Sequence, residues 1–401
     1  MTDPSRTAVV DPRPDLPIIG IVGAGTMGAG IAQVALEAGH EVVLHDVDGA
    51  ALGRARDRIA DGLSRRAARV VADPGGIDDW VAARIGRLRE SEVLEQLGDE
   101  ADLIVETALE SLELKATIFR TLDAVAPPAT ILATNTSALS VASIAAATAR
   151  PDRVIGLHFF NPAPLMALVE VVAGPASDPR LLARAAELVA AWGKTPVRAA
   201  DAPGFIVNRV NRPFTLRALR LLERGEATVE AVDGAIREAG FPLGPFELMD
   251  LTGIDVTLAA STAIWEALGR PERLRPSPIQ EELVAAGELG RKTGQGFYRY
   301  PAAGRGTVAN ERHRVGGGLT SDGIRERVLL PIVDEAFRAA AEGVAVRDDI
   351  DIALRLGAAH PIGPFERAAE AGGGPAIAAR LRELARDDPS LDPSAALEGR
   401  G

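Results

Sequence analysis

The chain has 401 residues, no cysteine and a formal net charge of −12. This length predicts two or three domains, and the absence of cysteine excludes a disulfide framework and thiolate chemistry. The acidic balance argues against a nucleic-acid groove or an anionic membrane surface, no apolar run is long enough to span a membrane, and the five histidines are too scattered for a metal site. We therefore expect a cytoplasmic protein whose redox chemistry depends on a bound cofactor. Residues 1–16 are expected to form a flexible tail, and they lack the pattern of a secretory signal.

Residues 18–30 predict the first strand, tight turn and helix of a dinucleotide-binding domain. An apolar run leads into a GxGxxG motif, and the positions predicted to contact the cofactor are Gly23, Gly25, Thr26, Met27 and Gly28. In this unit one glycine makes the turn, one admits the pyrophosphate and one lets the helix pack on the strand. The alternative is an α/β domain whose glycines serve only packing.

A second predicted strand ends at Asp46, about 20 residues beyond the glycines. A carboxylate at this position would hold the ribose hydroxyls of NAD and repel the 2′-phosphate of NADP. The sequence therefore predicts NAD as the cofactor.

Further strands and helices alternate up to about residue 200, as in a parallel doubly wound sheet. A long helix is predicted over residues 50–71, and its Arg65, Arg66 and Arg69 form a basic cluster in an otherwise acidic chain. Strands are predicted over 101–106, 130–134 and 153–160, with a helix over 112–124. The segment Asn135-Thr-Ser137 follows one of these strands directly, at the sheet edge where ligands bind.

Residues 154–172 predict two apolar strands joined by a turn that contains Pro162 and Pro164. If the hairpin is centred near Pro164, His158 and Glu170 lie opposite each other, about 5 Å apart. A carboxylate beside an imidazole fixes the ring's tautomer and supports the imidazolium, which suits a general base for hydroxyl oxidation. The alternative is a structural polar pair. Ser137 and Asn208 likewise fit a turn and the start of a helix when taken alone.

Helical periodicity replaces the strand pattern from about residue 201, and this helical region contains a repeat. The segment at 240–247, Gly-Phe-Pro-Leu-Gly-Pro-Phe-Glu, returns at 359–366 as Ala-His-Pro-Ile-Gly-Pro-Phe-Glu, and Arg209-Val-Asn-Arg-Pro returns as Arg327-Val-Leu-Leu-Pro. We predict a dinucleotide-binding domain over 17–200 followed by an all-α domain in two tandem copies, 201–300 and 319–385. A linker at 301–318 and a tail at 386–401 complete this division.

Six motifs in unbroken order resemble those of the L-3-hydroxyacyl-CoA dehydrogenase family. The resemblance covers residues 17–300 and rests on the glycine-rich segment 23–30, Asn135-Thr-Ser, His158-Phe-Phe-Asn-Pro, Pro203-Gly-Phe-Ile-Val-Asn-Arg, Gly244-Pro-Phe-Glu and Lys292-Thr-Gly-Gln-Gly-Phe-Tyr. It implies that His158 is the catalytic base and Glu170 its orienting partner. Ser137 and Asn208 are implied to hydrogen-bond the reacting oxygen and the neighbouring thioester.

The same resemblance implies the ligand contacts. For NAD, Asp46 is implied to contact the adenosine ribose, and Asn135 is a further contact. Three charged residues are implied to lie near the nicotinamide half: Glu110, Lys115 and Lys292. Each of these three also fits an ordinary surface charge. The substrate is implied to be an acyl-CoA thioester, with Asn161 as one contact. A family serine that touches CoA falls on Gly62 and a family lysine on Arg69. At these two positions the chain departs from the family's CoA contacts, but Arg65, Arg66 and Arg69 could still meet the CoA phosphates.

The resulting hypothesis is an NAD-dependent dehydrogenase that interconverts an L-3-hydroxyacyl-CoA and its 3-oxoacyl-CoA in fatty-acid or short-chain acyl-CoA metabolism. The alternatives are a dehydrogenase of a free 3-hydroxy acid, and an NAD-binding structural or regulatory protein on the same fold. Single-copy family members generally dimerise through the helical domain. A second copy would therefore take the partner's place in an intrachain pseudo-dimer without a catalytic group of its own, giving a monomer or weak oligomer.

Overall fold

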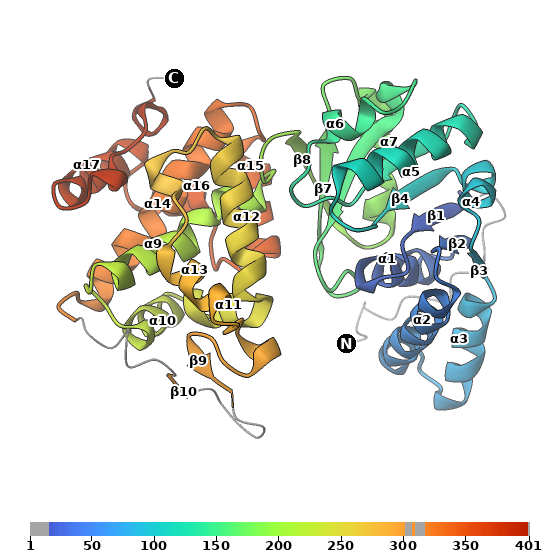
Figure 1. The fold of residues 1–401 in the computed structure, drawn as a ribbon, viewed down its shortest axis with the longest axis horizontal. Helices are drawn as coiled ribbons and strands as arrows, with labels where there is room; N and C mark the ends of the chain where they lie inside the picture. The colour runs from blue at the N-terminus through green and yellow to red at the C-terminus, as the bar shows by residue number, and fades with distance from the viewer. Residues whose placement is uncertain (1–15, 301–306, 309–316, 400–401) are drawn as a thin grey trace, which may run out of the picture. The chain divides into compact units, whose positions relative to one another are not determined.

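The computed structural model describes residues 16–300, 307–308 and 317–399. The chain divides into two compact units, Met1–Asp201 and Ala202–Gly401. The first is a sheet with helices on both faces and the second is helical (Figure 1). The predicted N-terminal tail, apart from residue 16, and most of the predicted linker lie outside the described residues.

The sheet of the first unit has eight strands in the order β3-β2-β1-β4-β5-β6-β7-β8. Strands β1 to β6 pair in parallel, β7 runs antiparallel to β6, and β8 is parallel to β7. The strand order reverses between β1 and β4, as in dinucleotide-binding folds. The strands are β1 Ile19–Val22, β2 Val42–His45, β3 Leu88–Ser91, β4 Leu103–Glu106, β5 Ile131–Thr134, β6 Val154–Phe159, β7 Leu168–Ala173 and β8 Thr195–Ala200.

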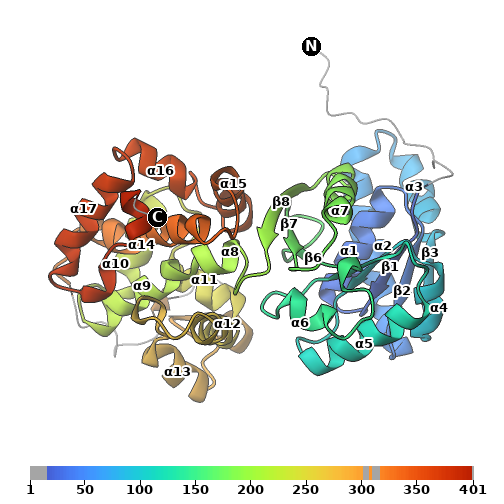
Figure 2. The same ribbon diagram turned by 90° about the horizontal axis from the view of Figure 1, so that it is seen from above.

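Helices cover both faces of this sheet, so its central strands are buried on both sides (Figure 2). One face packs against α1, α2 and α7 through side chains such as Ile21, Ile31 and Leu63. The other face carries α4, α5 and α6. The helices are α1 Thr26–Glu37, α2 Gly49–Val70, α3 Ile77–Ile85, α4 Leu94–Glu100, α5 Leu112–Val125, α6 Val141–Ala145 and α7 Pro179–Ala191.

The second unit is built from helices, with two very short strands, β9 Tyr298–Arg299 and β10 Thr307–Val308. Its longest helix, α14, packs against α8, α9 and α10. The helices are α8 Val207–Val210, α9 Arg212–Glu223, α10 Val229–Glu238, α11 Pro245–Thr252, α12 Ile254–Ala267, α13 Pro278–Ala285, α14 Ser321–Ala341, α15 Arg347–Gly357, α16 Pro364–Glu370 and α17 Gly374–Ala385. No helix within the described ranges is long and apolar enough to cross a membrane.

The predicted tail at 386–401 is wrong for the residues that the structure describes there. Two short 3₁₀ helices, Pro389–Leu391 and Ala395–Glu398, follow α17. Leu391 and Leu397 are buried in a core cluster with Val333 of α14 and Ile377 of α17. The sequence did not predict this packing because two isolated leucines in short turns carry no helical or strand periodicity.

Candidate active site

The glycine-rich turn between β1 and α1 shows which glycines the fold itself requires. Gly23 has a φ of +100°, and a Cβ there would lie 2.9 Å from the Thr107 hydroxyl. A Cβ on Gly28 would overlap the carbonyl oxygen of Gly23. A Cβ on Gly25, by contrast, would meet nothing within 4 Å. Packing therefore explains Gly23 and Gly28 but not Gly25, which is the N-cap residue of α1, where a pyrophosphate approaches in this type of turn.

Asp46 follows β2 at the carboxyl edge of the sheet and contacts the glycine-rich turn directly. Its Oδ2 accepts a hydrogen bond from the backbone N–H of Ala24 at 2.8 Å, and its Oδ1 accepts one from Asp48 at 3.1 Å. A carboxylate oxygen has two lone-pair sites, so each oxygen can still accept from a ribose hydroxyl. The residues present thus fit the adenosine half of NAD.

The loop after β5 is held by the Glu110 carboxylate. Glu110 Oε1 accepts from the Thr136 hydroxyl at 2.5 Å, from the Ser137 N–H at 2.9 Å and from the Ala138 N–H at 3.1 Å. Burial opposes ionisation of Glu110, but these hydrogen bonds and the Lys115 charge outweigh it and lower the pKa of the carboxyl. Glu110 therefore fixes the backbone that carries Ser137.

Lys115 lies beneath this loop, with only 1% of its surface exposed. Its Nζ donates to the two oxygens of Glu106 at 2.7 and 3.0 Å and to the carbonyl oxygen of Ala108 at 3.2 Å. The Glu110 Oε2 lies 3.4 Å away. Lys115 thus holds the segment that leads to Glu110, and a direct contact between Lys115 and the cofactor stays a prediction.

The predicted hairpin register is confirmed: His158 on β6 lies opposite Glu170 on β7. The His158 Nδ1 is 2.6 Å from the Glu170 Oε2, and the two residues are 6% and 0% exposed. A carboxylate at Nδ1 favours the tautomer with hydrogen on Nδ1, which places the basic lone pair of the ring on Nε2. Asn135 joins this strand to the β5 loop, because its Oδ1 accepts the Phe159 N–H at 2.8 Å.

The basic cluster lines an open groove of about 590 Å³ in the first unit. Its lining includes Arg65, Arg66 and Arg69 of α2, residues of the segment 162–167, and Lys194. The Lys194 Nζ donates to the carbonyl oxygens of Ala163, Pro164 and Met166, so it holds that segment in place. Gly62 is explained by close approach, because a Cβ there would overlap the Gln33 side chain, which also lines the groove.

Two predicted site residues belong to the helical unit. Asn208 is in α8, where its carbonyl oxygen accepts from the Arg212 Nε at 3.2 Å. The Lys292 Nζ forms an ion pair with Asp255, at 2.5 Å from its Oδ1. The sequence did not indicate a role for Glu106, Thr136 or Lys194, because each acts through a contact with residues distant in the chain. A weak signal was present for Thr136, inside the Asn-Thr-Ser motif.

Two family models match the chain. The NAD binding domain of 3-hydroxyacyl-CoA dehydrogenase matches residues 18–202, and the C-terminal domain of the same enzyme matches residues 204–300 and 324–397. The chain belongs to the 3-hydroxyacyl-CoA dehydrogenase family. It is an NAD-dependent enzyme of that family.

Individual relatives of this dehydrogenase agree with the family match. The 3-hydroxyadipyl-CoA dehydrogenase of Escherichia coli K12 is 36% identical, and the match covers 88% of this chain and 90% of that protein. The mitochondrial hydroxyacyl-coenzyme A dehydrogenase of Sus scrofa is 42% identical over 70% of this chain and 90% of its own. A crystal structure of 3-hydroxybutyryl-CoA dehydrogenase from E. coli K12 superposes with a TM-score of 0.88 at 33% identity, covering 96% of this chain and 98% of that one.

Proposed function

We propose that His158 is the general base of the dehydrogenase and that Glu170 is its positioning partner. The observation that carries this proposal is the buried Nδ1-to-carboxylate contact of 2.6 Å on the β6–β7 hairpin. With Nδ1 held by Glu170, the Nε2 of His158 takes the proton of the 3-hydroxyl group, and the Glu170 carboxylate stabilises the resulting imidazolium. Ser137, positioned by Glu110, and Asn208 hydrogen-bond the reacting oxygen and the thioester.

When bound, NAD supplies the acceptor for the hydride that leaves C3. The chain's own contribution to holding it is the turn at Gly23–Gly28 with Thr26 and Met27, together with Asp46, and, by the family resemblance, Asn135, Glu110, Lys115 and Lys292. The groove that Arg65, Arg66, Arg69 and Lys194 line supports binding of the CoA phosphates there, since guanidinium groups pair well with phosphate. A cytoplasmic location stays a prediction.

The substrate class is tested by following NADH formation from 3-hydroxybutyryl-CoA and from free 3-hydroxybutyrate. We expect turnover of the thioester and little turnover of the free acid, because the basic groove contributes binding only when CoA is attached. Preference for the free acid would favour the alternative dehydrogenase. Activity on neither, with NAD still bound, would refute the proposed use of the basic groove for a CoA thioester of this length.

Cofactor choice is tested at Asp46. We expect the kcat/KM for NAD to exceed that for NADP by at least about tenfold, because a 2′-phosphate beside this carboxylate costs about 1.4 kcal/mol or more. In the Asp46→Ser variant the ratio should shrink, while Asp48→Ser, which alters the neighbouring helix cap, should leave it unchanged. Equal kcat/KM values for the two cofactors in the natural chain would refute the role of Asp46.

We also propose that residues 319–385 are a second copy of the 201–300 module. This proposal is supported by the start of the helix in each repeated segment, where an aspartate accepts hydrogen bonds from two backbone N–H groups. Asp233 accepts from the N–H groups of Phe246 and Glu247 at 3.0 and 3.1 Å, and Asp351 accepts from those of Phe365 and Glu366 at 2.8 and 3.1 Å. In each copy the glutamate also accepts from the N–H of the glycine three residues before it. The aligned Gly240 and Ala359 both have positive φ, at 95° and 53°.

The contacts between the two segments are reciprocal, as in a two-fold dimer. Helix α10 packs on α14, and its counterpart α15 packs on α8, which aligns with the start of α14. The aligned Phe241 and His360 touch each other, with ring centroids 4.8 Å apart. This contact supports an intrachain pseudo-dimer whose pseudo-axis passes near these two rings.

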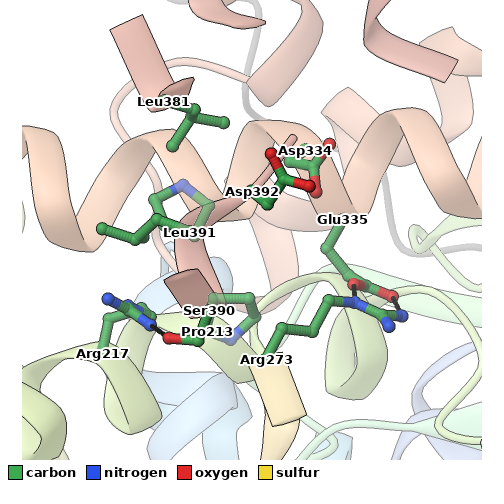
Figure 3. A pocket seen from close by; sticks show the side chains of 10 residues that line it. Pro213, Arg217, Arg273, Asp334, Glu335, Leu381, Ser390, Leu391 and Asp392 are labelled. Atoms are coloured by element: carbon green, nitrogen blue, oxygen red, sulfur yellow. Dashed lines mark hydrogen bonds and ion pairs between the residues drawn. The ribbon is translucent and has the colours of Figure 1, made fainter. Parts of the chain in front are cut away.

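Polar contacts also join the first segment to the chain beyond residue 318 (Figure 3). Arg273, which is partly exposed, pairs with the buried Glu335 of the second segment at 2.8 Å. Arg217 donates to Ser390 at 2.7 Å. It also pairs at 2.6 Å with Asp388, which like Ser390 follows the second segment. The second copy supplies no counterpart of Asn208: the aligned Glu326 is engaged with Arg380 at 2.6 Å. We infer that this copy serves packing and contributes no catalytic group.

A further inference from the structure

Three arginines on α8 and α9 are buried, and one of them differs from the other two. Arg209 is 1% exposed and pairs with Glu335 at 3.0 Å and with Glu342 at 2.8 Å. Arg217 is 3% exposed and pairs with Asp388 at 2.6 Å. Arg212 is 8% exposed and forms no ion pair with any carboxylate of the described residues.

The contacts of Arg212 are with neutral groups. Its Nε donates to the carbonyl oxygen of Asn208 at 3.2 Å, and its Nη1 lies 3.4 Å from the hydroxyl oxygen of Ser261. A guanidinium has five N–H donors, so most of its capacity is unused within the described residues. Burial lowers the pKa of Arg212 to about 10, so the side chain still carries its charge at neutral pH. Burying a charge without a partner costs free energy. Arg209 and Arg217 avoid this cost because each forms an ion pair with a carboxylate.

Arg212 lies beside a residue that the proposed function places at the substrate. Asn208 precedes it by four positions, which is about one helical turn of 5.4 Å. Under the proposed function the Asn208 side chain contacts the oxygen on the reacting carbon or the adjacent thioester. Three further C–C bonds, each about 1.5 Å long and joined at tetrahedral angles, place C6 about 3.9 Å from C3 in an extended chain. The sixth carbon of an acyl chain is therefore within reach of the next turn.

We propose that Arg212 binds a carboxylate at the far end of the acyl chain, and that the preferred substrates are 3-hydroxyacyl-CoA thioesters of about six carbons that end in a carboxylate. The inference rests on the proposed function and specifies its substrate class. A carboxylate would form the bidentate ion pair that Arg212 lacks. A methyl end would remove water from the guanidinium without providing a hydrogen bond in its place. The site thereby selects against the methyl-ended chain as well as for the charged one.

The test compares two thioesters of equal length, 3-hydroxyadipyl-CoA and 3-hydroxyhexanoyl-CoA, on the full chain with NAD. We expect the kcat/KM of the natural protein to be at least about tenfold higher for the carboxylate-ended thioester, with most of the difference in KM. Arg212→Met should bring the ratio to one or below, and Arg212→Lys should retain part of it. The matched control is Arg220→Met, on the same helix, which should keep the natural ratio.

A ratio near one in the natural protein would overturn the proposal without any variant. An equal loss for both thioesters in Arg212→Met would show that Arg212 is structural, which would also overturn it. Absence of turnover with both thioesters and with 3-hydroxybutyryl-CoA would refute the proposed function itself. Turnover of 3-hydroxybutyryl-CoA without a preference for the carboxylate end would refute only the role of Arg212.

Discussion

Replacing His158 by alanine is expected to lower the kcat for a 3-hydroxyacyl-CoA by about 10²-fold or more, because general-base catalysis contributes roughly that factor. The affinity for NAD should change little, since the predicted adenosine contacts lie at Asp46 and the glycine-rich turn. Steady-state kinetics combined with NAD binding by fluorescence separates the two effects. The control is His360→Gln, which changes a histidine that pairs with Asn211 in the helical unit.

Glu170→Gln tests the same pair from the other side. The amide keeps the shape of the side chain but removes the charge that stabilises the imidazolium, so turnover should fall while NAD still binds. Near-native turnover in His158→Ala would show that the histidine is a structural residue. Full activity in Glu170→Gln alone would limit the role of Glu170 to packing.

Truncation after Tyr300 is expected to give a protein that self-associates or is poorly soluble. The change removes α14 from the faces of α8, α9 and α10, and it takes away Glu335 and Asp388 from the buried Arg209 and Arg217. The exposed apolar face would exceed the several hundred Å² that soluble monomers usually tolerate. Light scattering over a range of concentrations, together with activity, measures the result.

The full-length chain is the control and should need no homodimer through this surface. If the truncated chain were a stable, fully active monomer, the pseudo-dimer proposal would fail. The second segment would then have to serve another contact.

The parts of the fold that sequence predicted well are those with a strong local signal. The GxGxxG turn, the strand that ends before Asp46 and the switch to helices near residue 201 each depend on residues close together in the chain. The His158–Glu170 register is confirmed because the position of a hairpin turn determines which side chains face each other.

Features that depend on distant contacts could not be predicted in the same way. Nothing near Glu110 in the chain shows that its carboxylate holds the loop of residues 136–138, and Lys194 binds backbone carbonyls about 30 positions away. Arg212 supports a functional hypothesis only because the structure shows it to be buried and without an ion pair to any residue that it describes. The folded segment after residue 385 was missed since its two buried leucines lack a periodic context.

The contact between Phe241 and His360 has a consequence for how this enzyme can evolve and unfold. At the axis of an ordinary homodimer a side chain meets its own copy, so one mutation changes both sides at once. Here the two positions are encoded separately, and an imidazole whose Nε2 donates to the Asn211 Oδ1 packs against a phenyl ring. Under the proposed pseudo-dimer each side can change alone, and resistance to unfolding no longer depends on protein concentration, as it does for a dimer that dissociates.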